Sequence, residues 1–161
     1  FFYEKNVREA ILRYKFGRKE IYAQYFGKLM AAAYSAKCPQ TIDAITWVPI
    51  SKERMRERGF NQAQRLAEEV GNSRNLPLIK TLKKTENNPA QSQMQSAAQR
   101  RANVRGVYLP VDPQQWVGKQ LLLVDDVVTT GSTLAECCRG LLTAGAAEVY
   151  CLTLAATRNT E

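Results

Sequence analysis

The sequence predicts an α/β fold built on a central, mostly parallel, twisted sheet that is flanked by helices. Residues 121–124 form a continuous apolar run, which is typical of a central parallel strand covered on both faces. The apolar spacing becomes helical from Ser132 onward, so we expect a helix after this strand. The chain has 161 residues, 45% of them apolar, which is enough for one core. We therefore expect a single domain over residues 1–161.

Two helices are expected near the amino end. Apolar residues recur on one face over residues 5–15 and again over residues 20–36. These stripes predict helices that each turn one side toward the core.

A second strand is expected over residues 42–50, ending at Pro49. The polar residues 51–54 then predict a loop, and residues 61–70 predict a helix. Because the strands are mostly parallel, this strand-end loop should lie close to the one that follows residue 124.

Two acidic residues and a hydroxyl-rich loop follow the strand at 121–124. Asp125 and Asp126 come where that strand is expected to end, and ligands of open α/β sheets collect at this edge. Ionised carboxylates accept hydrogen bonds from sugar hydroxyls or bind a metal ion. The start of a helix offers backbone N–H groups and hydroxyl donors to a phosphate. The pattern predicts a ribose 5-phosphate site, whose phosphate loop is Thr129, Thr130, Gly131, Ser132 and Thr133.

A simpler interpretation is that the aspartates are turn residues and that Ser132 or Thr130 caps a helix. One cap explains one residue and leaves the acid pair, the other hydroxyls and Gly131 unexplained. A Walker-type phosphate loop is disfavoured because no Gly-Lys-Ser/Thr follows.

Composition limits the classes of protein that fit. The net charge is +8, which favours an anionic ligand and would also attract DNA or RNA. No basic helix with interleaved aromatic residues is found, so sequence-specific nucleic-acid recognition has no local support. No apolar run approaches the roughly 20 residues that span a bilayer, so we expect no membrane insertion and a cytoplasmic protein. Without histidine or a CxxC pair, a structural zinc site within these residues is not expected.

The segment VDDVVTTGST resembles the phosphoribosyl pyrophosphate (PRPP) signature of type I phosphoribosyltransferases. Further marks resemble the competence-associated ComF family, and together they extend from about residue 3 to residue 157. They are Lys15-Phe16-Gly17, Arg58-Gly59-Phe60-Asn61-Gln62, Gln91, Arg100 and Asn103-Val104-Arg105-Gly106. The resemblance implies a type I phosphoribosyltransferase fold with a small amino-terminal hood, formed by residues 1–40 with a contribution from residues 108–116.

The resemblance also implies roles for the site residues. Asp125 and Asp126 would be catalytic, and the Thr129–Thr133 loop would hold the 5-phosphate of PRPP. Ser51 and Lys52 would hold the pyrophosphate, in a loop that often contains a non-proline cis peptide. The alternative for Lys52 and its basic neighbours is a solvated charged face.

Residues 83–101 are polar and lack an apolar stripe in their first half, which predicts a mobile segment. By resemblance this is the flexible loop that closes over PRPP and excludes water. Lys83 or Lys84 would reach the pyrophosphate, while Gln91 and Arg100 would position the closed loop. An ordinary surface loop is the alternative.

The predicted reaction is transfer of 5-phosphoribosyl from PRPP to an unidentified acceptor, a nucleobase or an amine, with release of pyrophosphate. Mg²⁺ would be held through PRPP and not directly by the protein. The family implies a setting in DNA uptake, with the uptake machinery or single-stranded DNA as partners, and a homodimer is a further expectation. A non-catalytic PRPP sensor and a DNA-associated competence protein remain alternatives. The chain starts without methionine, so we expect a fragment that lacks an upstream zinc-binding module.

Overall fold

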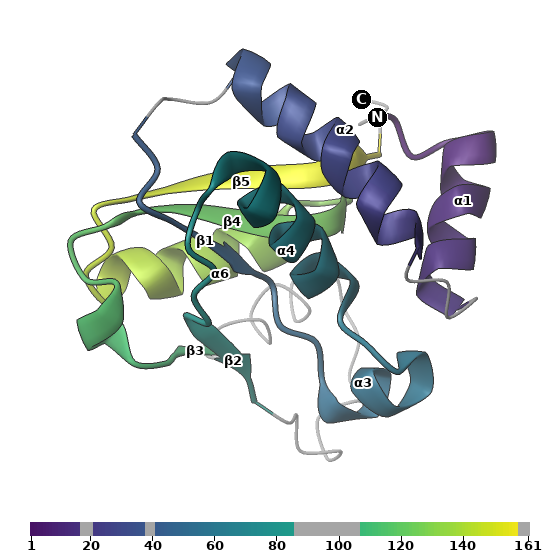
Figure 1. Ribbon diagram of the computed structural model, residues 1–161. Helices are drawn as coiled ribbons and strands as arrows, with labels where there is room; N and C mark the ends of the chain where they lie inside the picture. The colour runs from purple at the N-terminus through teal and green to yellow at the C-terminus, as the bar shows by residue number, and fades with distance from the viewer. Residues whose placement is uncertain (17–20, 38–40, 86–106, 158–161) are drawn as a thin grey trace.

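A computed structural model describes residues 1–16, 21–37, 41–85 and 107–157. Its central sheet is parallel, with strand order β1-β4-β5, and helices lie on both faces, which confirms the predicted fold class (Figure 1). The elements in chain order are α1 (Lys5–Phe16), α2 (Ile21–Lys37), β1 (Ala44–Trp47), α3 (Lys52–Arg58), α4 (Gln62–Arg74), β2 (Leu82–Lys84), β3 (Tyr108–Pro110), the 3-10 helix η2 (Pro113–Gln115), β4 (Gln120–Val128), α6 (Ser132–Thr143) and β5 (Glu148–Ala156).

The middle strand of the sheet is β4. It pairs with β1 on one side and with β5 on the other, so that Leu123 lies opposite Thr46 and Cys151. The side chains of Leu121–Val124 are completely buried, as the continuous apolar run predicts. The strand is longer than expected, however, and ends at Val128 rather than before the aspartates.

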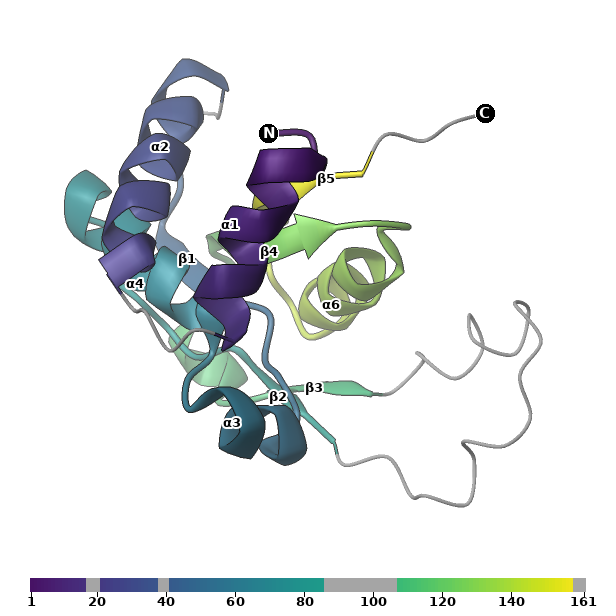
Figure 2. The same ribbon diagram turned by 90° about the vertical axis from the view of Figure 1, so that its right-hand side faces the viewer.

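The two faces of β4 are covered by different elements. Leu122 and Val124 pack in a core cluster with residues of α1, α2 and α4, whereas Leu121 and Leu123 pack in a second cluster with residues of α6. Figure 2 shows α2 and α4 on one side of the sheet and α6 on the other. This division follows from the alternation of side chains along a strand, and it decides what each aspartate meets.

A small antiparallel sheet of β2 and β3 lies below α6 in Figure 2. Lys84 pairs with Tyr108 in its register, and the buried Leu82 belongs to the same core cluster as α6. Lys83 and Lys84 were expected in a loop; they lie instead in a paired strand. The apolar Leu82 anchors that strand, because it is buried on the core.

Other boundaries also differ from the prediction. The strand expected over 42–50 is confined to Ala44–Trp47, and the loop expected at 51–54 is mostly the helix α3. The helix expected over 61–70 continues to Arg74, where Asn75 caps it in a left-handed conformation. Within the residues that the structure describes, no helix combines the length and the apolar character needed to cross a bilayer.

Candidate functional site

Asp125 and Asp126 lie near the carboxyl end of β4 and meet different neighbours. Asp126 follows the alternation of Leu122 and Val124, so it lies on the side of α1. There its Oδ2 is 2.9 Å from Lys15 Nζ, and the Lys15 and Asp126 side chains are 16% and 12% exposed. Asp125 lies on the side of α6, and its Oδ1 accepts a hydrogen bond of 2.8 Å from the backbone N–H of Asp126.

The charge of Asp125 is disfavoured by its surroundings. Burial is the largest cause, and the adjacent Asp126 carboxylate adds to it; together they raise the pKa of Asp125 to about 7. The hydrogen bond from the Asp126 N–H and the charges of Lys15 and Arg54 act in the opposite direction. Near neutral pH, Asp125 can therefore hold or release a proton.

Two basic residues approach Asp125 from its own side. Lys84 on β2 is partly buried, and burial followed by the charge of Arg54 lowers its pKa, which Asp125 partly counteracts. Its Nζ also lies 5.4 Å from the centre of the Tyr108 ring. Arg54 on α3 acts on Asp125, Lys84 and Tyr108 alike. The elements α3 and β2 therefore bring positive charge to one place beside the sheet, next to Tyr108 of β3.

The predicted phosphate loop connects β4 to α6. Gly131 has φ +75°, a left-handed conformation that favours glycine, and it precedes the first turn of α6. No side chain of the described residues caps this helix start, although Thr130 Oγ1 accepts a 3.4 Å hydrogen bond from the Ser132 N–H. Thr130 and Ser132 also share a hydrogen bond of 2.9 Å between their hydroxyls. Thr129 and Thr130 are exposed, and the Thr133 side chain is hydrogen-bonded to Tyr108. The loop can offer an anion hydroxyl and backbone N–H donors.

Ser51 and Lys52 lie where β1 leads into α3. The Ser51 hydroxyl accepts a 3.3 Å hydrogen bond from the Arg54 N–H and so caps α3, while Lys52 is exposed at the first position of that helix. All peptide bonds within the described residues are trans, so the non-proline cis peptide that the resemblance implied is not found at Ser51.

The segment Arg58–Gln62 fixes the turn between α3 and α4 against α1. Asn61 caps α4 through its hydrogen bond from the Gln64 N–H and donates 3.0 Å to the Val48 carbonyl at the end of β1. The Tyr14 hydroxyl donates 2.9 Å to the Gln62 carbonyl. These contacts make the segment a brace between α1 and the sheet.

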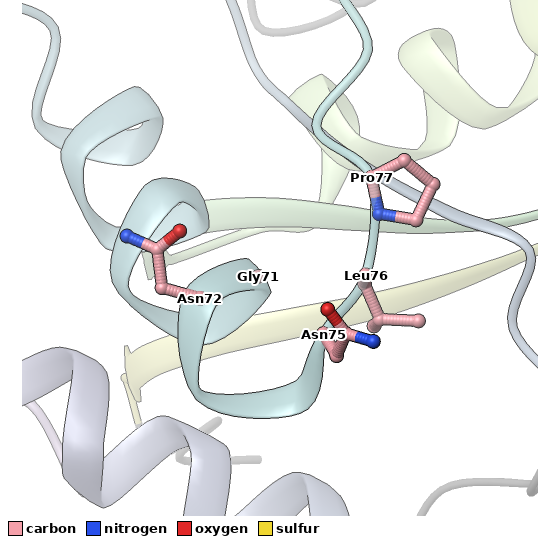
Figure 3. A pocket seen from close by; sticks show the side chains of 5 residues that line it. All are labelled: Gly71, Asn72, Asn75, Leu76 and Pro77. Atoms are coloured by element: carbon pink, nitrogen blue, oxygen red, sulfur yellow. The ribbon is translucent and has the colours of Figure 1, made fainter.

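A surface pocket lies elsewhere, at the carboxyl end of α4 (Figure 3). Shortly after α4 ends, Leu78 forms a bridge with Ile45 near the start of β1. The carboxyl end of α4 therefore lies at the amino edge of the sheet, away from the aspartates. Its lining contains two amides and no charged side chain, so it offers a phosphate no positive charge. The lining residues are Gly71, Asn72, Asn75, Leu76 and Pro77.

The structure brings together Asp125, Asp126 and Lys84, whereas Gln91 and Arg100 lie outside the described residues. Lys15 and Arg54 were not among the site residues predicted from the sequence. Lys15 could have been suspected because it opens one of the family marks, whereas Arg54 looks like any member of a basic run.

Comparison with known proteins places this geometry in a family. The model of the phosphoribosyl transferase domain matches residues 56–161. The chain is 31% identical to competence protein ComFC of Bacillus subtilis over 153 residues, which cover 94% of this chain and 60% of that protein. It is also 31% identical to the DNA utilization protein YhgH of Escherichia coli K12 over 156 residues, covering 93% of this chain and 68% of YhgH.

A structural comparison gives the same fold. The structure of the allosteric regulatory enzyme of purine biosynthesis superimposes with a TM-score of 0.55 at 23% identity, covering 82% of this chain and 25% of that one. The chain spans about 60% of the length of ComFC. The matched domain and the similarity along nearly the whole chain show that this protein belongs to the competence-associated ComF family. The domain of this family is a type I phosphoribosyltransferase domain.

Proposed function

We propose that the protein binds PRPP and transfers its 5-phosphoribosyl group to an acceptor, releasing pyrophosphate. One observation carries the proposal: an aspartate pair and a helix start rich in hydrogen-bond donors are joined at one edge of the sheet. A ribose 5-phosphate needs both, because its hydroxyls donate to carboxylates and its phosphate accepts from N–H and hydroxyl groups. Since the relatives are named for competence and DNA utilization, we propose DNA uptake as the setting.

In this proposal the Thr129–Thr133 loop holds the 5-phosphate, and Asp125 and Asp126 accept hydrogen bonds from the ribose hydroxyls. Positive charge develops on the sugar ring as the bond between ribose C1 and the pyrophosphate oxygen breaks, and the carboxylates stabilise it. The pyrophosphate leaves with the electron pair of that bond. The acceptor, a nucleobase or an amine, forms the new bond from its nitrogen to C1 and gives its proton to solvent.

The pyrophosphate would lie on the side of Asp125, where Arg54 and Lys84 supply positive charge. Ser51 and Lys52 at the start of α3 stay candidates for the same group. Lys83 on β2 stays a candidate for contact with the pyrophosphate, and Gln91 and Arg100 stay candidates for the loop that closes over PRPP. Closure would exclude water, which competes with the acceptor for the activated ribose.

The side chains of the site suit a magnesium ion that arrives with PRPP. Among the described residues, no three cysteine, aspartate or glutamate side chains gather to hold a metal ion, and Asp126 is already paired with Lys15. Asp125 is then the carboxylate of the pair that is left to interact with Mg²⁺, and it would do so indirectly, through the ribose hydroxyls. When bound, Mg²⁺ would offset the negative charge of the leaving pyrophosphate.

Calorimetric titration of PRPP with and without Mg²⁺ tests the proposal. We expect magnesium-dependent binding that is lost in the double variant Asp125→Asn/Asp126→Asn, with thermal unfolding used to show that this variant is folded. Lys28→Gln is the matched control, because Lys28 is exposed on α2 and should not affect binding. A folded wild-type protein that gives no heat with PRPP would overturn PRPP binding as its function.

A non-catalytic PRPP sensor is the second candidate, and the ion pair between Lys15 and Asp126 favours it. That pair already engages one of the two carboxylates that would stabilise the transition state. Pyrophosphate release, measured over a panel of nucleobases and amines, separates the candidates, because a sensor binds PRPP and does not consume it. A cytoplasmic location and a homodimer stay proposals.

A further inference from the structure

Lys15 connects an element outside the matched domain to the aspartate pair. The domain match begins at residue 56, and α1 precedes it. The Lys15 ammonium and the Asp126 carboxylate are 2.9 Å apart, and neither side chain is more than 16% exposed. Removing two charges from water costs free energy, which only a well-positioned pair recovers. The surroundings of Lys15 must therefore hold its ammonium in position.

The residues on both sides of Lys15 are anchored. Tyr14 is completely buried, and its hydroxyl donates to the Gln62 carbonyl at 2.9 Å. On the other side, the Arg58 guanidinium lies 5.3 Å from the centre of the Phe16 ring, and Arg58 Nη1 donates 2.9 Å to Gln62 Oε1. The segment Arg58–Gln62 thus holds the carboxyl end of α1. The Lys15 ammonium is therefore positioned before any ligand binds.

The ammonium also has a distinct place among the charges of the site. Arg54 and Lys84 act on Asp125, on the side of α6. Lys15 pairs with Asp126 on the side of α1, and its charge also lowers the pKa of Asp125, so it acts on both carboxylates. Two adjacent carboxylates would otherwise repel the anionic PRPP or attract a divalent cation, since carboxylate oxygens are the ligands that Mg²⁺ prefers.

We propose that Lys15 is a positioning residue that serves as the built-in cation of the aspartate pair, in the place that a second Mg²⁺ would otherwise take. PRPP then needs only the single Mg²⁺ carried by its pyrophosphate. Lys15 holds the Asp126 carboxylate in a fixed orientation through a charge-assisted hydrogen bond, and the carboxylate keeps its other lone pairs for a ribose hydroxyl. This inference rests on the proposed binding of PRPP.

Titrations of PRPP at a series of Mg²⁺ concentrations test the inference. Lys15→Gln keeps a hydrogen-bond donor and removes the charge, Lys15→Arg keeps the charge, and Lys28→Gln is the exposed control. We expect Lys15→Gln to bind PRPP roughly tenfold more weakly at low Mg²⁺. Its affinity should rise more steeply with Mg²⁺ and recover at high concentration, because a second ion replaces the ammonium. Lys15→Arg and Lys28→Gln should follow the wild type.

Three results would overturn the inference. A loss of affinity that is equal at every Mg²⁺ concentration would mean a merely structural role for Lys15. Tighter binding by Lys15→Gln would mean that Lys15 blocks the site, and unchanged binding would mean that it does not act there. Lys15→Met serves as a second uncharged variant where Lys15→Gln does not fold.

A second measurement separates this inference from the proposed function. Mn²⁺ is titrated in the absence of PRPP and followed by electron paramagnetic resonance of the free ion. We expect Lys15→Gln to bind Mn²⁺ and the wild type to bind at least tenfold more weakly. Equal Mn²⁺ binding by both proteins would overturn the inference even where PRPP binds. A wild type that ignores PRPP, together with a Lys15→Gln variant that gains Mn²⁺ binding, would overturn only the proposed function.

Discussion

Asp125 and Asp126 are neighbours in the chain, yet they lie in different electrostatic surroundings. Side chains alternate along β4, so Asp126 forms an ion pair with Lys15 from α1. Asp125 lies on the other face, where the charges of Arg54 and Lys84 act on it in addition to that of Lys15. One carboxylate is fixed by an ion pair, and the other has its pKa raised to about 7. The two residues can therefore serve one ligand in different ways, Asp126 as a fixed acceptor and Asp125 as a group that exchanges a proton near neutrality.

The raised pKa of Asp125 predicts how stability depends on pH. In the unfolded chain the carboxyl titrates at its ordinary pKa of 3.8, and in the folded protein at about 7. Between these values the folded state binds more protons than the unfolded state, so the free energy of unfolding falls as the pH rises from about 4 to about 7. Asparagine does not titrate, so Asp125→Asn removes this fall in the free energy of unfolding. We expect its Tm to exceed that of the wild type by roughly 5 °C at pH 8.

Thermal unfolding of both proteins at pH 5 and pH 8 checks this expectation. The difference in Tm between Asp125→Asn and the wild type should be smaller at pH 5. Most of the fall in the free energy of unfolding of the wild type occurs above that pH. Asp126→Asn is a useful comparison, since it breaks the ion pair with Lys15 and should lower the Tm. A difference between Asp125→Asn and the wild type that is the same at both pH values would contradict the raised pKa.

The sequence offers as candidates those residues that follow one another in the chain. The aspartates and the Thr129–Thr133 loop are such candidates, because a strand, a glycine turn and a helix start occur in one continuous segment. Lys15 could not be placed, because its contact with Asp126 depends on how α1 packs on the sheet. Arg54 likewise reaches Asp125 only because residues 52–58 form a helix.

At the scale of elements, α2 and α4 pack unusually closely at Gly27. A Cβ at this position would lie 2.3 Å from the Cβ of Glu69 on α4, which is closer than two such atoms can approach. Glycine therefore permits the contact between these helices, at a cost in helix propensity. The close approach matters for the site, because α4 and α2 share the core cluster on the side of Asp126.

Gly27→Ala is expected to destabilise the protein although alanine favours helices. The clash should cost about 2–3 kcal/mol, because the hypothetical Cβ meets a Cβ near the backbone of α4, and so outweigh a gain of about 1 kcal/mol in helix propensity. We therefore expect a Tm lowered by roughly 2–6 °C. Gly140→Ala is the matched control in α6, because a Cβ there would lie 3.6 Å from the Tyr108 carbonyl oxygen, an ordinary contact. Its Tm should be unchanged or higher, and an equal loss in both variants would contradict the close approach of α2 and α4.

Long elements could be predicted from the sequence, and short ones could not. The two amino-terminal helices and the core of β4 carry apolar patterns over many residues, and the structure confirms them. By contrast, β2 and β3 have three residues each and exist because they pair with one another across a long connection. The helix α3 has no buried residue, so it offers no apolar stripe. Its start is set instead by the capping hydroxyl of Ser51.

At the scale of the whole molecule, positive charge is the dominant property. The net charge is +8, and the exposed side of α3 contributes Lys52, Arg54 and Arg56. Such a field attracts the anionic PRPP and also attracts any nucleic acid, irrespective of its sequence. The proposed setting in DNA uptake makes single-stranded DNA the nucleic acid to test.

We expect this protein to bind single-stranded DNA weakly and through charge alone. Electrophoretic shifts with oligonucleotides should show binding at low salt, with the affinity falling at least tenfold between 50 and 200 mM salt and without a preference among sequences. Arg56→Gln, on the exposed side of α3, should weaken the binding of every oligonucleotide alike. The slope of log affinity against log salt concentration should become shallower by about one, as for the loss of one phosphate contact. A complex that survives 200 mM salt, or that distinguishes one sequence from another, would contradict this expectation. Either result would favour a DNA-associated competence protein, because contacts other than charge would then hold the strand.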